Sequence, residues 1–299
     1  MKRWLDASAA VGAVVWTSLM TIPLAPNLGI GTIEKLFLLG PLVVVPLGLA
    51  LIGVGRAIIY LQPLAGAAVV ASFFLPPGLL AGMLVVPWLI LVALAALGGL
   101  DRLVRGGATE FCFGAALMML AVGGVGLLQS RLGMTPLGFR EPLVLLVAVH
   151  FHYAAFVSPI MAGAVIRRTK FLAWPVAISA SIGSPILAAG YVLHVPAVRL
   201  LGAMLLVVAL CGVSVLTFAA LRNVRPRAGQ FLLGLAASSV VIAMAYASVY
   251  AVADFFGEVW VAIPHMARTH GVINALGFSV AGLLGWRLAE GRETNAANA

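Results

Sequence analysis

The amino-acid sequence predicts an all-α, polytopic integral membrane helix bundle of about ten transmembrane helices, with both termini in the cytoplasm. Three observations predict it: the composition, the length of the apolar runs and the sidedness of Lys and Arg. Of the 299 residues, 63% are hydrophobic and 9% are charged, whereas a soluble domain is about 45–50% apolar and about 25% charged. The polar residues needed to cover a water-soluble core are missing. The composition therefore argues against a soluble enzyme, a disordered protein and a nucleic-acid-binding domain.

The apolar runs set the number of helices, because a span needs about 20 mostly apolar residues. Backbone groups in lipid must be satisfied within the segment, so such runs form helices, and the short alternating segments of a β-barrel are absent. We expect one transmembrane domain over residues 1–289 and a short polar cytoplasmic tail over 290–299. The ten predicted spans are 7–25, 36–55, 57–76, 78–100, 109–128, 142–166, 171–193, 196–221, 229–253 and 270–289.

The basic residues orient these spans. If the N-terminus and every second connection face one side of the membrane, that side carries 13 of the 18 Lys and Arg residues, and the other side carries 5. Cytoplasmic loops hold the excess of Lys and Arg. The split therefore predicts cytoplasmic termini in a multi-pass protein of the cell inner membrane. The two cysteines, Cys112 and Cys211, lie inside apolar runs without a C-x-x-C pair, which is typical of small buried hydrophobes.

Ionisable and strongly polar side chains inside a membrane are costly, so each is a candidate for function. Under the predicted topology, all five histidines lie at the outer ends or in the outer halves of spans. Several acids and tyrosines lie at the same side. They are Glu34, Glu141, Asp254, Glu258, Tyr191, Tyr246 and Tyr250.

The first polar segment is His150-Phe151-His152-Tyr153, in the sixth predicted span. Positions i and i+3 of a helix share a face, whereas i and i+2 point about 200° apart. We therefore expect His150 and Tyr153 to face one site and His152 to face elsewhere. A helix distorted near Pro159 would change this expectation.

The second polar segment begins at Thr269 in the last predicted span. His270 and Asn274 are four residues apart and share a helix face, and Gly271 and Gly277 allow another helix to approach. A buried amide needs a hydrogen-bond partner, so we expect Asn274 to find a His or Tyr of the sixth span. We further predict that the imidazoles of residues 150 and 270 lie within about 8–10 Å, one helix–helix spacing.

These two segments also carry a family resemblance. His-Phe-His-Tyr-Ala at 150–154 and Met-Ala-Arg-Thr-His-Gly-Val-Ile-Asn-Ala-Leu-Gly-Phe at 266–278 resemble the YndJ-like family of bacterial membrane proteins. The resemblance implies a polytopic membrane protein in which positions 150–153 and 269–274 belong to one site. Some members of that family carry an additional soluble part. The resemblance implies no reaction.

The residue types favour a membrane enzyme doing acid–base chemistry on a lipophilic small molecule, by isomerisation, cyclisation, dehydration or hydrolysis. Histidine titrates near neutrality, and Asn and Tyr can orient a substrate oxygen. We expect no cofactor and no metal, and as partners the lipid bilayer and the substrate, without nucleic acid. The sequence does not specify protein partners. The predicted catalytic residues are His150 and His270 as acid and base, with Tyr153 and Asn274 positioning the substrate. The predicted substrate-binding residues are His152, Thr269, Tyr246, Tyr250, Asp254 and Glu258, of which Asp254 or Glu258 would tune a histidine.

Three alternatives stay open at the level of the sequence. His150 and His270 could be axial ligands of haem or another metal group, in electron or quinone chemistry. Polar groups within spans also suit a proton-coupled transporter. In the purely structural alternative, the histidines make interhelical hydrogen bonds without chemistry, and those at the interface snorkel to water.

Overall fold

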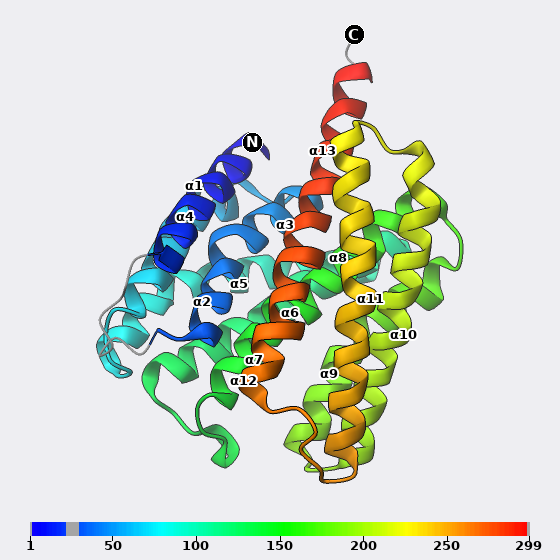
Figure 1. The fold of residues 1–299 in the computed structure, drawn as a ribbon. Helices are drawn as coiled ribbons and strands as arrows, with labels where there is room; N and C mark the ends of the chain where they lie inside the picture. The colour runs from blue at the N-terminus through cyan, green and yellow to red at the C-terminus, as the bar shows by residue number, and fades with distance from the viewer. Residues whose placement is uncertain (1, 22–29, 298–299) are drawn as a thin grey trace. The chain divides into compact units, whose positions relative to one another are not determined.

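The computed structural model describes residues 2–21 and 30–297, and this part of the chain is helical without a strand. The helices fall into two compact units, each described by itself. Unit 1 comprises residues 1–104 and 114–156, and unit 2 comprises residues 105–113 and 157–299. This division leaves the expectation of a single domain over residues 1–289 as a prediction. Figure 1 traces the helices in chain order.

Unit 1 contains the N-terminal helices. The stretch over residues 32–52 is one helix with a π turn at its centre, made of α2, η2 and α3, and its most apolar window is 94% buried. The elements of unit 1 are α1 (Lys2–Thr21), α2 (Thr32–Leu39), η2 (Gly40–Val44), α3 (Val45–Ile52), α4 (Arg56–Ser72), α5 (Leu79–Arg105, up to residue 104), most of α6 (Ala108–Leu132), η3 (Pro136–Gly138) and α7 (Leu143–His152).

Unit 2 contains the C-terminal helices. They are most of α8 (Ala154–Thr169), α9 (Ala173–Val192), α10 (Pro196–Ala220), η4 (Leu221–Asn223), α11 (Arg227–Phe255), α12 (Ile263–Met266), η5 (Ala267–Gly271), η6 (Ile273–Val280) and α13 (Ala281–Ala297). The predicted polar tail from residue 290 continues α13, so its backbone is helical through Ala297.

Glycines set how closely the unit 2 helices pair. A Cβ on Gly190 of α9 would stand 2.5 Å from the amide nitrogen of Arg199 in α10, and one on Gly183 would stand 2.7 Å from Leu206. From the first contact to the second, α9 runs seven residues backward while α10 runs seven residues forward. The two helices are therefore antiparallel and closely packed. Gly277 of η6 likewise lies against Ser239 of α11. The predicted close approach of a helix at Gly277 is therefore confirmed.

Eight segments are long and apolar enough to cross a membrane: 32–52, 79–104, 108–132, 143–169, 173–192, 196–223, 227–255 and 263–290. They match eight of the ten predicted spans. The other two predicted spans stay predictions. The segment predicted at 57–76 forms α4, an apolar helix of 17 residues, which is shorter than the eight. The helix α1 is not among the eight either, and residues 22–25 of the span predicted at 7–25 lie outside the described part of the chain.

The charge rule does not decide between eight and ten crossings. If α1 and α4 do not cross, Lys35 and Arg56 exchange sides, and the split of Lys and Arg stays 13 to 5. Every connection after residue 79 keeps its predicted side. The predicted catalytic and substrate-binding residues, which all follow residue 79, therefore keep the same side for both counts.

Candidate functional site

His152 lies at the centre of unit 1 with 0% of its surface exposed. Its Nδ1 lies 2.8 Å from the carbonyl of Ala148, and its Nε2 lies 3.2 Å from Nε1 of Trp88. A carbonyl can only accept and an indole N–H can only donate, so Nδ1 carries the proton and Nε2 accepts. The ring stacks on Trp88 at 5.7 Å between centroids and meets the edge of Phe37 at 5.1 Å. Both ring nitrogens are thus occupied in a closed aromatic cage.

Glycine makes room for this cage. A Cβ on Gly123 would stand 2.7 Å from Nδ1 of His152, and one on Gly40 would contact the His152 side chain at 3.5 Å. The imidazole therefore takes the space that side chains on α6 and η2 would otherwise fill. These contacts give His152 a packing role, and its contact with a substrate stays a prediction.

Tyr153 completes a π turn in the neighbouring helix. Pro41 has no amide hydrogen to donate to the carbonyl of Phe37. The amide of Gly40 bonds that carbonyl instead, which leaves the carbonyl of Leu36 without its usual donor. The Tyr153 hydroxyl donates to that Leu36 carbonyl at 2.7 Å. A buried hydroxyl and a buried carbonyl are thereby satisfied together.

Gln62 does the same for the other half of the π turn. The amide of Val45 bonds the carbonyl of Gly40, and the carbonyl of Pro41 instead accepts from Gln62 Nε2 at 2.9 Å. The Gln62 amide oxygen accepts from the hydroxyl of Ser8 at 2.6 Å. The carbonyls released by the π turn therefore bond to protein side chains.

His150 does not share a face with Tyr153. The helix breaks at Tyr153 (φ −110°, ψ −75°), where α7 ends and α8 begins, and His150 is exposed while Tyr153 is 7% exposed. The expected i and i+3 pairing fails because the break turns Tyr153 into the core beside His152. The proton on Nδ1 of His150 is donated to its own helix, at 2.9 Å from the Leu146 carbonyl.

His270 and Asn274 do come together, as their spacing predicts. Asn274 Nδ2 lies 3.4 Å from His270 Nε2, and His270 Nδ1 lies 2.8 Å from the carbonyl of Ala243 in α11. The carbonyl again fixes the proton on Nδ1 and leaves Nε2 as an acceptor. The partner that the structure gives Asn274 is thus His270, on its own span, where the sequence suggested a residue of the sixth span.

Tyr246 and Tyr250 continue the face of α11 that meets His270. Ala243, Tyr246 and Tyr250 stand at i, i+3 and i+7, which is one helix face. All lie in the described part of unit 2, and both tyrosines are partly buried. Four predicted site residues of unit 2 therefore lie on neighbouring turns of two packed segments: Tyr246 and Tyr250 on α11, and His270 and Asn274 on η5 and η6.

An ionic cluster lies at the end of this face. Arg199 Nε lies 3.2 Å from Asp254 Oδ2, with 21% and 24% of the two side chains exposed, and the guanidinium lies over the ring of Tyr191 at 5.1 Å. Asp254 is therefore held by Arg199, a partner that sequence reasoning treated only as a topological marker. The sequence feature that indicates this position of Arg199 is Gly190, because the absence of a side chain there lets the Arg199 backbone pack against α9.

The remaining candidates lie at the surface of unit 2. The hydroxyl of Thr269 donates to the carbonyl of His265 at 2.8 Å, so it caps its own helix turn. His265 and Glu258 are exposed. Among the described residues, no group of three or more His, Cys, Asp or Glu side chains could hold a metal ion.

The two predicted polar segments belong to different units, since 150–154 lies in unit 1 and 269–274 in unit 2. A site shared by His150 and His270 thus stays a prediction. Sequence reasoning missed Trp88 and Gly123, which hold His152, and Gln62, which completes the π turn. A Trp, a His and a Gly on three apolar segments give no spacing signal, because their contacts are long-range.

Comparison with known proteins places the chain in a family. The family model described as "YndJ-like protein" matches residues 35–278. The membrane protein YndJ of Bacillus subtilis (strain 168) is 29% identical over 195 residues, which are 63% of this chain and 34% of that relative. The chain thus spans about a third of the length of the curated relative that it matches. No solved structure matches it. The chain, an all-α membrane protein, belongs to the YndJ-like family.

Proposed function

We propose that this membrane protein is an acid–base catalyst of the bacterial inner membrane and acts on a lipophilic small molecule, with His270 as its proton acceptor. One observation supports the proposal above the others. Nδ1 of His270 donates to the Ala243 carbonyl of a neighbouring helix, while Nε2 lies 3.4 Å from the amide nitrogen of Asn274, a long contact. Such a contact exceeds the usual 2.7–3.2 Å of N–H hydrogen bonds, so a substrate donor can replace it.

The arrangement suits general-base chemistry. The Ala243 carbonyl accepts a hydrogen bond from Nδ1–H and so stabilises the imidazolium that forms when Nε2 takes a proton from the substrate. The Asn274 amide, released from Nε2, can donate to a substrate oxygen on which charge develops. Tyr246 and Tyr250 lie on the same face of α11 and would contact the substrate. A base placed this way contributes about 10²–10⁴-fold to a rate, and isomerisation, cyclisation, dehydration and hydrolysis can all use it.

The proposal rests on unit 2 alone. His152 and Tyr153 have all their polar atoms engaged in packing contacts, so neither is given a catalytic role. A ligand to haem or metal needs a free lone pair, which His152 lacks because Trp88 donates to it. Asp254 is already paired with Arg199, so we assign it no contact with the substrate.

The test is a complementation experiment read by profiling of lipids and small molecules. A strain without the gene would receive the wild-type gene, His270→Gln, Asn274→Ala or, as the matched control, the exposed His265→Gln. We expect the strain without the gene and the His270→Gln strain to accumulate the same lipophilic species, and His265→Gln to restore the wild-type profile. A wild-type profile from His270→Gln, with the variant present in the membrane at normal amounts, would contradict the proposal. So would a deletion that changes no measured species.

A further inference from the structure

The two ends of unit 2 carry different charge. One end gathers the last turns of α8 and α10, the middle of α13 and the first turns of α6, α9 and α11. It holds seven cations with described side chains and two acids, Glu110 and Glu290. At the opposite end, two arginines stand against two acids: Arg199, Arg268, Asp254 and Glu258. The seven cations of the basic end are Arg167, Arg168, Lys170, Arg222, Arg225, Arg227 and Arg287.

The connections at the basic end lie next to one another. Extending the α9–α10 register by ten residues beyond Gly183 and Leu206 brings Ala173 opposite Leu216. The α8–α9 connection therefore lies beside the end of α10, which leads into the α10–α11 connection. The hydroxyl of Ser214 in α10 donates to the Ala237 carbonyl in α11, at 2.7 Å, so this pair is also in register.

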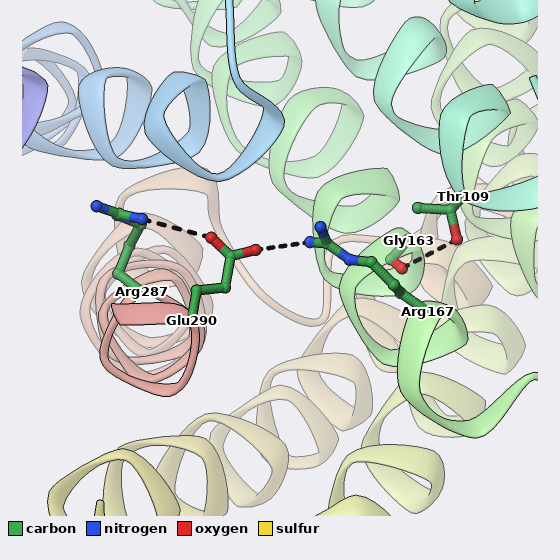
Figure 2. A network of polar contacts seen from close by, with 5 residues as sticks. All are labelled: Thr109, Gly163, Arg167, Arg287 and Glu290. Atoms are coloured by element: carbon green, nitrogen blue, oxygen red, sulfur yellow. Dashed lines mark hydrogen bonds and ion pairs between the residues drawn. The ribbon is translucent and has the colours of Figure 1, made fainter. Parts of the chain in front are cut away.

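Part of the positive charge is already neutralised inside the protein. Glu290 lies between Arg167, at 2.8 Å, and Arg287, at 3.4 Å. Figure 2 shows this carboxylate bridging the two guanidinium groups from α8 and α13. Lys170, Arg222 and Arg227 are exposed, and in the described part of the chain none of them pairs with an acid. Three cations of the two adjoining connections therefore remain for an outside anion.

Exposed apolar side chains stand directly beside these cations. Phe171 is 62% exposed and Phe231 is 71% exposed, each within four residues of an exposed cation. Lys170 (φ 55°) and Leu172 (φ 46°) are both in the left-handed region, which non-glycine residues rarely adopt. This sharp turn holds Phe171 outward between them. Strain of this kind clusters at sites that bind ligands.

We infer that the basic end of unit 2 binds an anionic phospholipid, with the phosphate on Lys170, Arg222 and Arg227 and the acyl chains against Phe171 and Phe231. An anionic headgroup matches the unpaired cations, and the adjacent exposed aromatic rings match its lipid tails. A soluble anion would use the cations alone. The inference does not depend on the proposed chemistry at His270, which lies toward the opposite end of the same helices.

The test compares two lipids of identical acyl chains on the purified full chain in neutral detergent. Native mass spectrometry measures retention of phosphatidylglycerol and of phosphatidylcholine. We expect phosphatidylglycerol to bind at least about tenfold more tightly, and Arg222→Gln with Arg227→Gln to weaken it by about thirtyfold, since each basic residue contributes to the attraction. The matched control is Arg222→Lys with Arg227→Lys, which keeps the charge and should keep the binding.

Three results would overturn the inference. The first is equal retention of the two lipids by the wild-type chain. The second is unchanged retention of phosphatidylglycerol by the double Gln variant. The third is full displacement of phosphatidylglycerol by glycerol 3-phosphate, which would identify a soluble anion as the occupant. Phe231→Ser provides an independent readout, because it should weaken lipid retention while the cations remain.

Discussion

Two imidazoles inside the same membrane protein share a tautomer and differ in what they face. His152 and His270 both donate from Nδ1 to a backbone carbonyl, at 2.8 Å in each case. His152 donates within its own helix, and its Nε2 is closed off by the indole of Trp88 with none of its surface exposed. His270 donates to a neighbouring helix, and its Nε2 meets Asn274 at 3.4 Å while the side chain is partly exposed.

The difference shows that a polar residue in a membrane span is not by itself a functional residue. Both histidines meet the usual criterion, since ionisable groups in lipid are costly and therefore suggest function. The cost at His152 is offset by complete hydrogen bonding and by the stacked rings. The geometry around Nε2, closed for His152 and loosely held for His270, separates a packing residue from a candidate base.

The largest difference between the two histidines is expected in the stability of their alanine variants, His152→Ala and His270→Ala. The first change removes a fully buried ring and leaves the Trp88 N–H without a partner, so we expect it to lower the free energy of unfolding by about 4 kcal/mol, from the cavity and the unsatisfied donor together. His270→Ala, at a partly exposed position, should cost about 1 kcal/mol. Unfolding in mixed detergent micelles, followed by circular dichroism, measures both. Equal losses would show that the two sites do not differ as described.

The fold was largely predictable from the sequence, and the site only in part. Apolar runs and the sidedness of Lys and Arg depend on local composition, so eight of the ten spans appear in the structure. The contact between His270 and Asn274 was predictable because it follows from helical spacing. The cage of His152 was not, because Trp88 is 64 residues away and no periodicity links the two. The break at Tyr153 was not predictable either, and it separates Tyr153 from His150 and places it in the core beside His152.

A glycine change tests the cage without touching the imidazole. Gly123→Ala places a Cβ 2.7 Å from His152 Nδ1 and 3.0 Å from the Phe151 Cβ, so we expect a loss of about 2 kcal/mol from overpacking. Gly212→Ala is the matched control, since a Cβ there meets nothing within 4 Å, and it should raise stability by up to about 1 kcal/mol. The same unfolding titration compares them. A neutral Gly123→Ala would mean that the α6–α7 contact is looser than this packing implies.

Tyr153→Phe asks whether the π turn depends on its side-chain partner. Removal of the hydroxyl leaves the buried Leu36 carbonyl without a donor, which should cost about 1.5 kcal/mol. Tyr246→Phe, on the face of α11 that we assign to substrate, should change stability by less than about 0.5 kcal/mol. Hydrogen exchange of the amides around Leu36 provides a second measurement, because protection there should fall only in Tyr153→Phe. Loss of protection in both variants would remove the distinction between a structural and a substrate-facing tyrosine.

Asn274→Ala should have the smallest effect on stability and is the sharpest comparison. Its contact with His270 Nε2 is 3.4 Å long, beyond the distance at which N–H hydrogen bonds are strong, so we expect a loss of about 0.5 kcal/mol. If Asn274 were a packing partner like Trp88, its removal would destabilise the helix as strongly as opening the His152 cage. If it positions a substrate oxygen, the variant should instead fold normally and fail to restore the lipid profile in the complementation assay. A variant that folds and gives the wild-type profile would show that Asn274 neither packs nor positions substrate. The long contact at Nε2 would then no longer distinguish His270 from His152.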